Sequence, residues 1–418
     1  MNHLIAVAAF VFAASAAHAQ TEIVVQYPYA ELFDATMKAE AEAFSAAHPD
    51  IKVTYRSAYK DYEDASQRVL REAITGSTPD VTFQGLNRVR VLADKSVAVA
   101  LDSYVAAEKN FSLDGYHAGM LAAGEANGKV YGLPFAISLP IMYYNLDLVK
   151  QAGGDPDNLP KTWDEVIALA RKINGLGNGV HGIATEWAIS GNWMWEAMIR
   201  AEGGTLMKAD ETDVAFDSEA GRKAIHLLAR LVTETQSPNL SVSDMIASFS
   251  AGKIGMYLTS TSRLNTLQKQ AGGKFALKTW TYPGLVPGVS KLPAGGNVGM
   301  ILSKDPEKQK AAWEFLKFVS GAEGGAIMVK TTGAYMAPNT RAAEGLKDFY
   351  AANPNQYTAV SLLPYFTGWY AFPGENGLKI TDVIKDRLQS VMDGTRTNEP
   401  DKVLADMAAD VRALLPRK

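Results

Sequence analysis

The sequence predicts an α/β protein with two lobes, and three observations support this fold class. Residues 22–83 alternate between strand-like and helical patterns, which is typical of a mainly parallel sheet flanked by helices. The same alternation returns in the middle of the chain. The length of 418 residues exceeds what one hydrophobic core usually serves, so two domains are expected.

The order of elements predicts the first domain. A β-branched run over residues 22–27 is followed by apolar residues at helical spacing over residues 32–44 and by a second strand from Ile51. A helix over residues 61–74 and a third strand over residues 80–83 follow. Ligands bind at the carboxyl ends of strands in such sheets. The candidate contacts at these ends are Gln26, Tyr27, Tyr29 and Gln84.

The later part of the chain shows the same kinds of element. Residues 128–145 contain two strand-like runs. A helix begins near Thr162, the predicted N-cap, and Glu165 completes a capping box. Amphipathic helices are predicted over residues 305–319 and 380–392. The sequence contains no internal repeat and no low-complexity linker, so a flexible connection between the two domains is not expected.

The N-terminus predicts export. The first nineteen residues, MNHLIAVAAFVFAASAAHA, have an apolar centre and a small-x-small ending, which is typical of a signal peptide over residues 1–19. The sequence contains no cysteine, which excludes disulfides, thiol catalysis and the acylated cysteine of a lipoprotein. No other segment approaches eighteen apolar residues. We therefore expect a periplasmic protein that has no lipid anchor and is not embedded in the membrane.

Composition and motifs argue against several kinds of chemistry. The formal net charge of −4 is mildly acidic, which argues against nucleic acid as a partner. The six histidines show no paired spacing, so no metal site is expected. The sequence has neither a phosphate-binding loop nor a nucleophile elbow. Asp61, Glu63 and Glu196 could serve a glycosidase, but with 45 acidic residues in the chain their presence does not discriminate.

Aromatic residues in polar, loop-like contexts are the most informative feature. Trp187, Trp193 and Trp195 lie among Gly, Ser, Asn and Thr, and Trp369 lies in the segment YFTGWYAFPGENG. Aromatic faces beside hydrogen-bonding side chains suit sugar rings, which present both C–H faces and hydroxyl edges. Core packing is the alternative interpretation for each of these residues. Two further tryptophans, on amphipathic helices, are assigned to the core: Trp163 and Trp313.

A run of hydroxyl residues ends the stretch FSAGKIGMYLTSTSR. The apolar part predicts a strand, and Thr259 to Ser262 mark the point where it gives way to a helix. These hydroxyls either cap that helix or hold a ligand. In the second case, the free N–H groups of the helix N-terminus favour an electron-rich group, and Arg263 either adds charge or faces solvent.

Several motifs follow one another in an order that characterises a known family. They are AFSAAHPDIKV, TPDV, NGKVYGLPFAISLPIMYYNLDLVKQAG, PKTWDEVIALARKI, FSAGKIGMYLTSTSR, AGGNVGMILSKDPEKQKAAWEFLKFV and TTGAYMAPN. With these motifs, which span most of the mature chain, the protein resembles the extracellular solute-binding proteins of ABC transporters for sugars and glycerol-phosphate compounds, which include maltose-binding protein. The leucine–proline–aromatic crossing before YYN and the F-x-x-G-K-x-G-M motif are the most specific parts of the resemblance.

The resemblance implies a type II periplasmic binding protein fold, in which two α/β lobes are joined by a multi-stranded hinge and the ligand lies in the cleft between them. The predicted N-terminal lobe comprises residues 20–134 and 297–337, and the C-terminal lobe comprises residues 135–296 and 338–418. The ligand contacts of the family, carried over position by position, fall on Gln26, Tyr27, Tyr29, Glu63, Gln84, Ser138, Trp187, Ser260, Thr261, Ser262, Gly295, Gly296, Asn297, Tyr335 and Trp369.

Two departures from the family pattern bear on the ligand. Maltodextrin binders place a stacking aromatic residue where this chain has TSTS, so a long glucan is not expected. Glycerol-phosphate binders use a late arginine that the segment GWYAFPGENG lacks, which argues against a phosphodianion. The resemblance thus implies a monomer, without catalytic residues, metal or cofactor, that delivers a small sugar, glycoside or polyol derivative to ABC permease subunits. The alternatives are an anionic sugar or glycerol derivative as ligand and, more distantly, a secreted carbohydrate-active hydrolase.

Overall fold

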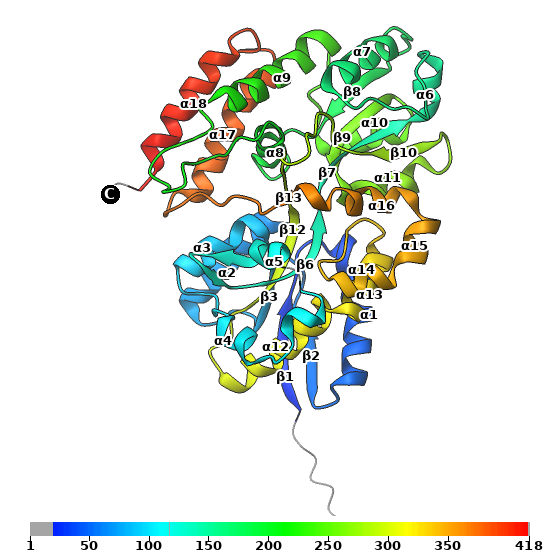
Figure 1. Cartoon of the computed structure of the whole chain (residues 1–418). Coiled ribbons are helices and arrows are strands. Elements are labelled where there is room, and N and C mark those ends of the chain that lie inside the picture. Colours follow the sequence, from blue (N-terminus) through cyan, green and yellow to red (C-terminus); the bar gives the residue numbers. More distant parts are fainter. Residues whose placement is uncertain (1–19, 117, 417–418) are drawn as a thin grey trace, which may run out of the picture.

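The computed structural model describes residues 20–116 and 118–416, and over these residues the chain forms two α/β lobes (Figure 1). The predicted signal peptide, residues 1–19, lies outside the described residues. Each lobe contains one large sheet, and the lobes are joined by strands that run from one sheet into the other. The two-lobe α/β class predicted from the sequence is confirmed.

The N-lobe is built on a five-stranded sheet in the order β2-β1-β3-β12-β6. Strands β1, β2 and β3 are parallel, as predicted. Helices α1, α12 and α13 pack together on this sheet, and Phe44 of α1 contacts Phe315 and Phe318 of α12. The elements of this lobe are β1 (Thr21–Gln26), α1 (Ala30–Ala47), β2 (Ile51–Tyr55), α2 (Tyr62–Thr75), β3 (Val81–Gly85), η1 (Leu86–Arg88), α3 (Val89–Asp94), α4 (Asp102–Ala107), η2 (Phe111–Asp114), α5 (Ala118–Leu121), η3 (Ala122–Gly124), β4 (Glu125–Ala126), β5 (Lys129–Val130), β6 (Leu133–Ser138), β12 (Gly295–Ile301), α12 (Pro306–Ser320) and α13 (Ala322–Thr332).

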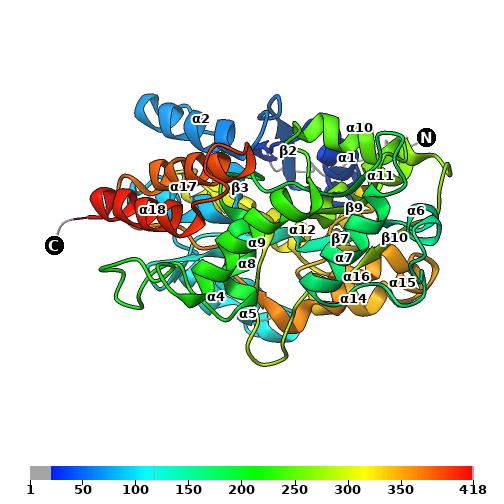
Figure 2. The same ribbon diagram turned by 90° about the horizontal axis from the view of Figure 1, so that it is seen from above.

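The C-lobe is built on a four-stranded sheet in the order β10-β7-β9-β8. Helices α17 and α18 pack on each other and on α9, at the outer side of this lobe (Figure 2). The elements of this lobe are β7 (Pro140–Asn145), α6 (Leu146–Gln151), α7 (Trp163–Asn174), β8 (His181–Thr185), α8 (Trp193–Ala201), α9 (Glu219–Thr235), α10 (Val242–Ser250), β9 (Ile254–Ser260), η4 (Thr261–Arg263), α11 (Leu264–Ala271), β10 (Leu277–Trp280), β11 (Leu292–Pro293), η5 (Leu363–Tyr365), β13 (Phe366–Thr367), α17 (Gly377–Met392) and α18 (Pro400–Leu414).

Both sheets are mixed rather than mainly parallel, which corrects one detail of the predicted fold. Strand β12 runs antiparallel to β3 and β6, and β7 runs antiparallel to β9 and β10. Both β12 and β7 enter their sheets directly from the other lobe. A strand that arrives through the hinge runs away from the cleft, whereas a strand fed by a helical crossover runs toward it. The direction of such a strand therefore depends on where the chain comes from, which its own residues do not encode.

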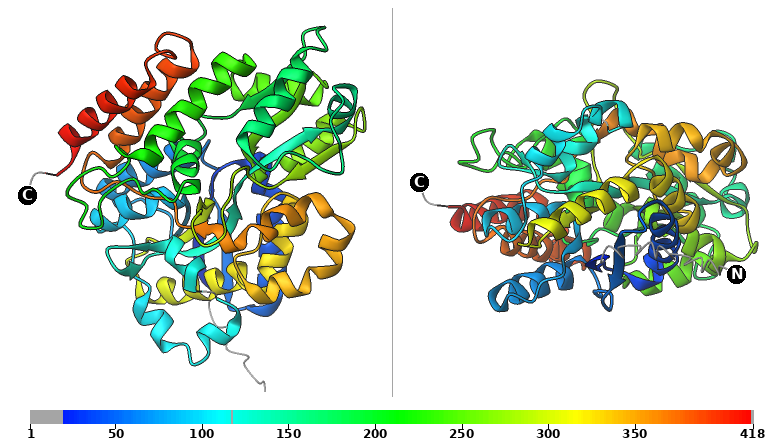
Figure 3. Two further views of the ribbon diagram at one scale, coloured as in Figure 1. Left: turned by 45° about the horizontal axis from the view of Figure 1, so that its top comes forward. Right: turned by 90° about the horizontal axis from the view of Figure 1, so that it is seen from below.

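Three passages of the chain form the hinge. Strand β6 continues through Leu139 into β7, and β11 continues through Ala294 into β12. The third passage contains Met336 and pairs with strand β6 of the first passage. Ile137 of β6 and Met336 exchange two backbone hydrogen bonds, of 2.9 and 3.3 Å. The segment after it, α14 (Thr340–Gly345), α15 (Lys347–Ala352) and α16 (Pro354–Ser361), runs along one side of the molecule (Figure 3). Helix α14 contacts α13 of the N-lobe, whereas α16 contacts β10 of the C-lobe. The lobe boundaries inferred from the sequence stay a prediction.

The local signals at two element ends are confirmed. The Thr162 Oγ1 accepts from the Glu165 N–H at 3.3 Å, and the Glu165 carboxylate accepts from the Thr162 N–H at 2.9 Å, so the predicted capping box begins α7. Strand β9 ends at Ser260 and is followed by η4 and α11, as the TSTS stretch predicts. Of the two tryptophans assigned to the core, Trp313 is buried and Trp163 is partly buried.

Candidate ligand-binding site between the lobes

A cavity lies between the lobes, beside the hinge. It contains about 480 Å³ of free space, part of which is open to solvent. Both lobes contribute to its wall, so the cavity exists only when the lobes are close together. The lining residues are Tyr29, Leu32, Tyr62, Ser138, Ile189, Ser190, Trp193, Ser260, Ser262, Arg263, Gly295, Gly296, Tyr335 and Trp369.

Tyrosine hydroxyls line the N-lobe side of the cavity. The ring of Tyr29 meets the ring of Tyr62 edge-on, with centroids 5.0 Å apart. Tyr29 stands before the first turn of α1 with φ of 57°, a left-handed conformation that costs a non-glycine residue about 1–2 kcal/mol. Burial raises the pKa of Tyr335 to about 12, although Arg263 and a hydrogen bond with Ser262 oppose the rise. These phenols are therefore neutral hydrogen-bonding groups at physiological pH.

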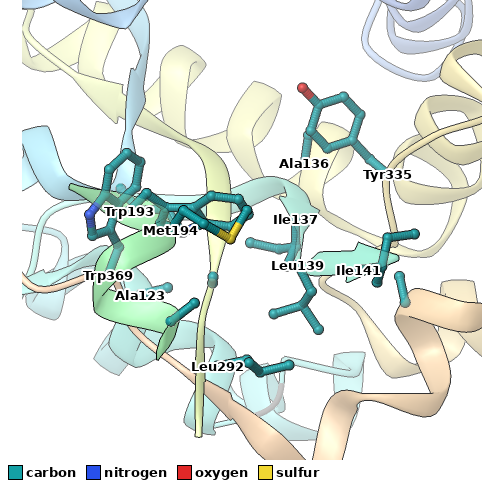
Figure 4. Packing of buried hydrophobic residues seen from close by; sticks show 14 of the residues in the cluster. Ala123, Ala136, Ile137, Leu139, Ile141, Trp193, Met194, Leu292, Tyr335 and Trp369 are labelled. Carbon is teal, nitrogen blue, oxygen red and sulfur yellow. The ribbon is translucent and has the colours of Figure 1, made fainter. Parts of the chain in front are cut away.

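Two tryptophans form an aromatic wall on the C-lobe side. The rings of Trp193 and Trp369 have centroids 6.2 Å apart and planes inclined by 53°. Figure 4 shows the two rings side by side, with Tyr335 across the hinge strands from them. Both indole Nε1 atoms are buried without a hydrogen-bond partner among the described residues. Because an unsatisfied buried donor costs about 1–3 kcal/mol, an acceptor on a ligand that reaches either N–H group would stabilise this wall.

Two glycines at the hinge side of the cavity allow neighbouring groups to pack directly against their backbone. A Cβ at Gly295 would lie 2.7 Å from the Ser138 Oγ and 3.0 Å from the Trp193 ring. Gly296 has φ of 104°, and a Cβ there would lie 1.8 Å from the Ala136 carbonyl oxygen. A side chain at either position would displace a wall of the cavity or the paired strand β6. This explains why glycine occupies both positions.

A buried carboxylate orients the one cationic side chain of the described cavity wall. Arg263 donates to the Glu186 carboxylate from Nη2 at 2.6 Å and from Nε at 3.2 Å. Glu186 is 1% exposed and also accepts from the Tyr257 and Thr259 hydroxyls. Burial acts to lower the pKa of Arg263, but attraction to Glu186 outweighs it and holds the pKa above its ordinary value. The guanidinium is thus fixed, and Nη1 has no hydrogen-bond partner among the described residues.

The TSTS hydroxyls have different partners. The Ser260 Oγ accepts from the Ser262 N–H at 3.1 Å and from the Ser262 hydroxyl at 2.9 Å, so Ser260 caps η4. The Thr261 Oγ1 accepts from the Leu139 N–H at 3.2 Å, which ties this segment to the hinge. Ser260 and Ser262 line the cavity, whereas Thr261 is buried behind it. Capping and facing the cavity therefore occur together at this junction.

Five other predicted contact residues are buried outside the cavity lining. The Gln26, Gln84 and Asn297 side chains lie on neighbouring strands, and an amide oxygen of each is buried without a partner among the described residues. Asn297 donates to the Tyr62 hydroxyl at 3.2 Å, beneath the cavity wall. The other two are Tyr27, which donates to Asp34 at 2.7 Å, and Trp187, which donates to Asn239 at 3.1 Å.

The remaining predicted residue, Glu63, lies in a charged recess beside the cavity. Glu63 is paired with the buried Arg88, and the recess contains about 720 Å³ of free space, part of it open to solvent. Ser190 borders both the cavity and the recess, which makes them neighbouring parts of one cleft. The other lining residues of the recess are Ser66, Gln67, Ala188, Gly191, Leu378, Thr381, Asp382 and Lys385.

The sequence analysis missed several lining residues. Trp193 stands in the polar aromatic stretch that was singled out, but its neighbour Trp187 was chosen in its place. Leu32 lies on α1, whose sequence carries no signal of a site, and Tyr62 directly precedes the predicted contact Glu63 on α2. Ile189 and Ser190 follow β8, and a search of every strand end would have included them.

No carboxylate of the described residues lines the cavity. Asp61 caps α2, where its Oδ1 accepts from the Asp64 N–H at 2.8 Å. Glu196 is fully buried and paired with Arg200 at 2.5 Å. The described part of the chain also contains no cluster of three or more His, Asp or Glu side chains suited to a metal ion. The two flanking carboxylates that glycoside hydrolysis requires are therefore not found in the described cavity.

The fold and the site define a class of protein: a two-lobed receptor with a hydroxyl-rich, aromatic cavity for a small molecule. The profile of the family described as "Bacterial extracellular solute-binding protein" matches residues 30–326, and the chain belongs to this family. Membership places it among bacterial solute-binding proteins that act outside the cytoplasm. In the described part of the chain, none of the helices is long and apolar enough to cross a membrane.

Similar proteins agree with this assignment. A binding protein of Brucella abortus (strain 2308) is 28% identical over 311 residues, which cover 71% of either chain. The sn-glycerol-3-phosphate-binding periplasmic protein UgpB of Pectobacterium atrosepticum is 26% identical over 307 residues, covering 70% of this chain and 67% of that one.

Two solved structures share the fold. UgpB from Mycobacterium tuberculosis in complex with glycerophosphocholine has a TM-score of 0.81 at 23% identity, covering 93% of this chain and 97% of that chain. A solute-binding protein of Thermotoga lettingae bound with α-D-tagatose has a TM-score of 0.79 at 20% identity, covering 95% of this chain and 100% of that chain.

Proposed function

We propose that this protein is the periplasmic receptor of an ABC importer and captures a small sugar, glycoside or polyol derivative between its lobes. The cavity wall carries the proposal, because it combines two indole rings with unpaired N–H groups, three tyrosines and several serine hydroxyls. Such a wall offers hydrogen bonds to hydroxyls and apolar faces to C–H groups. Similar proteins are named for binding tagatose, glycerol phosphate and glycerophosphocholine, which supports a ligand of this kind.

An anionic sugar or glycerol derivative is the second candidate ligand, and Arg263 is the observation that favours it. Arg263 lines the cavity, its Nη1 has no hydrogen-bond partner among the described residues, and it belongs to the segment that begins with η4. Glu186 already balances its charge. A ligand with one negative charge, such as a sulfonate or a phosphodiester, would therefore bring one uncompensated charge into the cavity and a dianion would bring two, so the monoanion suits this arrangement better.

The proposed mechanism is capture by closure of the lobes. The ligand first contacts one lobe, and the second lobe closes over it because the ligand binds the closed form more tightly than the open form. The protein moves through the periplasm as a monomer without a lipid anchor. In its closed form it then docks on the permease subunits. A dissociation constant near micromolar, about −8 kcal/mol, is ordinary for this role.

A thermal-shift screen followed by calorimetry tests the proposed function. The panel contains neutral monosaccharides and disaccharides, polyols, sulfonated sugars and glycerol phosphodiesters. A compound that binds the folded protein raises the melting temperature in a concentration-dependent manner. We expect such a shift for a member of the panel, confirmed as one-site binding by calorimetry. Hydrolysis of p-nitrophenyl glycosides by the purified protein would contradict the proposal.

A further inference from the structure

An ion pair joins the two lobes outside the lining of the ligand cavity. Arg90, on α3 of the N-lobe, donates from Nη1 and Nη2 to the Glu211 carboxylate at 2.6 and 2.7 Å. Glu211 stands in the loop between α8 and α9 of the C-lobe, which reaches toward α3 in Figure 1. Tyr370, also of the C-lobe, donates its hydroxyl to the same carboxylate at 2.7 Å. None of these three residues is among those that line the cavity.

The loop that carries Glu211 is held in a defined shape. Met207 and Val214 form an antiparallel bridge at its base. Asp213 is paired with Lys208 at 2.9 Å and with Arg412 of α18 at 2.8 Å. At the tip, Glu211 has φ of 55°, a conformation that L-residues other than asparagine and aspartate rarely adopt. The loop thus presents its carboxylate to the other lobe at the expense of an unfavourable backbone conformation.

The charges of the pair are partly shielded from water. The Arg90 side chain is 20% exposed and the Glu211 side chain is 34% exposed. Hydrogen bonding to Arg90 lowers the pKa of Glu211, and hydrogen bonding to Glu211 raises the pKa of Arg90, so both remain charged at neutral pH. Bidentate, charge-assisted hydrogen bonds are strong and orientation-dependent. Separation of the lobes would break these two bonds and leave Glu211 with its partner Tyr370 alone.

We infer that Arg90, Glu211 and Tyr370 form an interlobe latch that stabilises the closed form of the protein and thereby raises its affinity for a ligand. These are positioning residues, since they act through the relative position of the lobes rather than by touching the ligand. Tyr370 follows Trp369 of the aromatic wall directly, so the latch and the cavity wall move as one segment. The inference rests on the lobe movement that the proposed function contains.

The absence of cysteine permits a direct test in the ligand-free protein. Cysteines introduced by Ile74→Cys and Lys402→Cys, at positions 86% and 69% exposed in the N-lobe and the C-lobe, carry a donor and an acceptor dye. Single-molecule energy transfer then reports the closed fraction at about 20 mM and about 500 mM sodium chloride. Over this range the screening length falls from about 20 Å to about 4 Å, which weakens a partly exposed ion pair.

We expect the closed fraction of the parent to fall at least about threefold from low to high salt. Glu211→Gln keeps the shape of the side chain but removes its charge. At both salt concentrations this variant should show the low closed fraction that the parent shows only at high salt. Glu202→Gln is the matched control, because Glu202 is also 34% exposed and pairs with Lys223 at 3.0 Å within the C-lobe. This control should behave as the parent does.

A charge swap, Arg90→Glu combined with Glu211→Arg, guards against a simple folding defect. It should restore part of the closed fraction that Arg90→Glu alone removes, with melting temperatures measured for all variants. Equal closed fractions in the parent and in Glu211→Gln at low salt would overturn the latch. A single unchanging population in every variant, with and without saturating panel compounds, would overturn both the latch and the lobe movement of the proposed function.

Discussion

At the scale of single residues, three tryptophans from similar sequence contexts have different environments. The Trp187 Nε1 donates to Asn239, whereas the Nε1 atoms of Trp193 and Trp369 are buried without a partner among the described residues. Trp193 and Trp369 line the cavity and Trp187 does not. An unpaired indole nitrogen does not by itself mark the cavity wall, because the Nε1 atoms of Trp195 and Trp280 are also buried without a partner among the described residues and neither residue lines the cavity. Position in the cavity lining, rather than sequence context, therefore separates the candidate binding tryptophans from Trp187.

Substitution of these tryptophans by phenylalanine tests this distinction. Trp193→Phe and Trp369→Phe should weaken binding of the compound identified in the screen by about tenfold, or about 1.4 kcal/mol, because an indole donor is lost while a ring remains. Calorimetry gives the affinities and thermal unfolding gives the stabilities. Trp187→Phe is the control and should lose stability but not affinity. Unchanged affinity in both cavity variants would assign all three tryptophans to the core.

The Arg263–Glu186 pair allows stability and binding to be separated at the same scale. Arg263→Met leaves the Glu186 carboxylate, 1% exposed, without its cation and should cost about 3 kcal/mol of unfolding free energy. The double variant Arg263→Met with Glu186→Gln should recover most of that stability, because no buried charge remains. Its affinity should stay low, since Nη1 is absent. Urea unfolding and calorimetry measure the two quantities, and full recovery of affinity in the double variant would show that Arg263 does not contact the ligand.

At the scale of elements, the junction between β9 and α11 combines a cap, a hinge contact and part of the cavity wall. Ser260 caps η4, Thr261 accepts from the Leu139 N–H, and Ser262 faces the cavity near Tyr335. The order of the residues in the chain explains this division, because successive positions on a tight turn point in different directions. A single four-residue stretch can therefore serve structure and binding at once.

Single substitutions in this junction should separate the two roles. Thr261→Val keeps the shape but removes the acceptor of the Leu139 N–H, so it should lower the free energy of unfolding by about 1–3 kcal/mol. Ser262→Ala should weaken binding with little effect on stability, because Ser262 is only partly buried. Calorimetry and urea unfolding of both variants, with Ser260→Ala alongside, provide the measurement. Parental affinity in Ser260→Ala, Thr261→Ala and Ser262→Ala alike would reduce the segment to a cap.

At the scale of the whole molecule, two lobes with separate sheets are connected by three passages and meet around one cavity. Few backbone segments have to bend for the lobes to separate, which is the arrangement of a hinge transition. The ion pair between Arg90 and Glu211 adds an interlobe contact that such a separation would break. Closure therefore depends on the hinge, the ligand and the latch together.

Ligand-dependent compaction follows from this arrangement. Small-angle scattering should show a smaller radius of gyration for protein saturated with the screened compound than for the ligand-free protein. A panel compound that does not bind is the control for solvent effects. Identical scattering curves with and without a bound compound would mean that the lobes do not close on it.

The sequence by itself determined the elements whose signals are local. The capping box of Thr162 and Glu165, the strand from Ile51 and the transition at TSTS depend on residues within a few positions of one another, and all three are found in the structure. The family was also recognisable, because its motifs are short and continuous. Eight of the fifteen predicted contact residues line the cavity: Tyr29, Ser138, Ser260, Ser262, Gly295, Gly296, Tyr335 and Trp369.

Only the tertiary structure decided which side chains meet. Gln26 and Gln84 stand at strand ends, as predicted, but both are fully buried and neither lines the cavity. The direction of β12 and the contact of Arg90 with Glu211, which are 121 positions apart, also depend on how distant segments are placed. The physical reason is that burial and hydrogen bonding are set by every group that approaches a side chain in space. Local sequence patterns carry only the part of that environment that neighbouring residues supply.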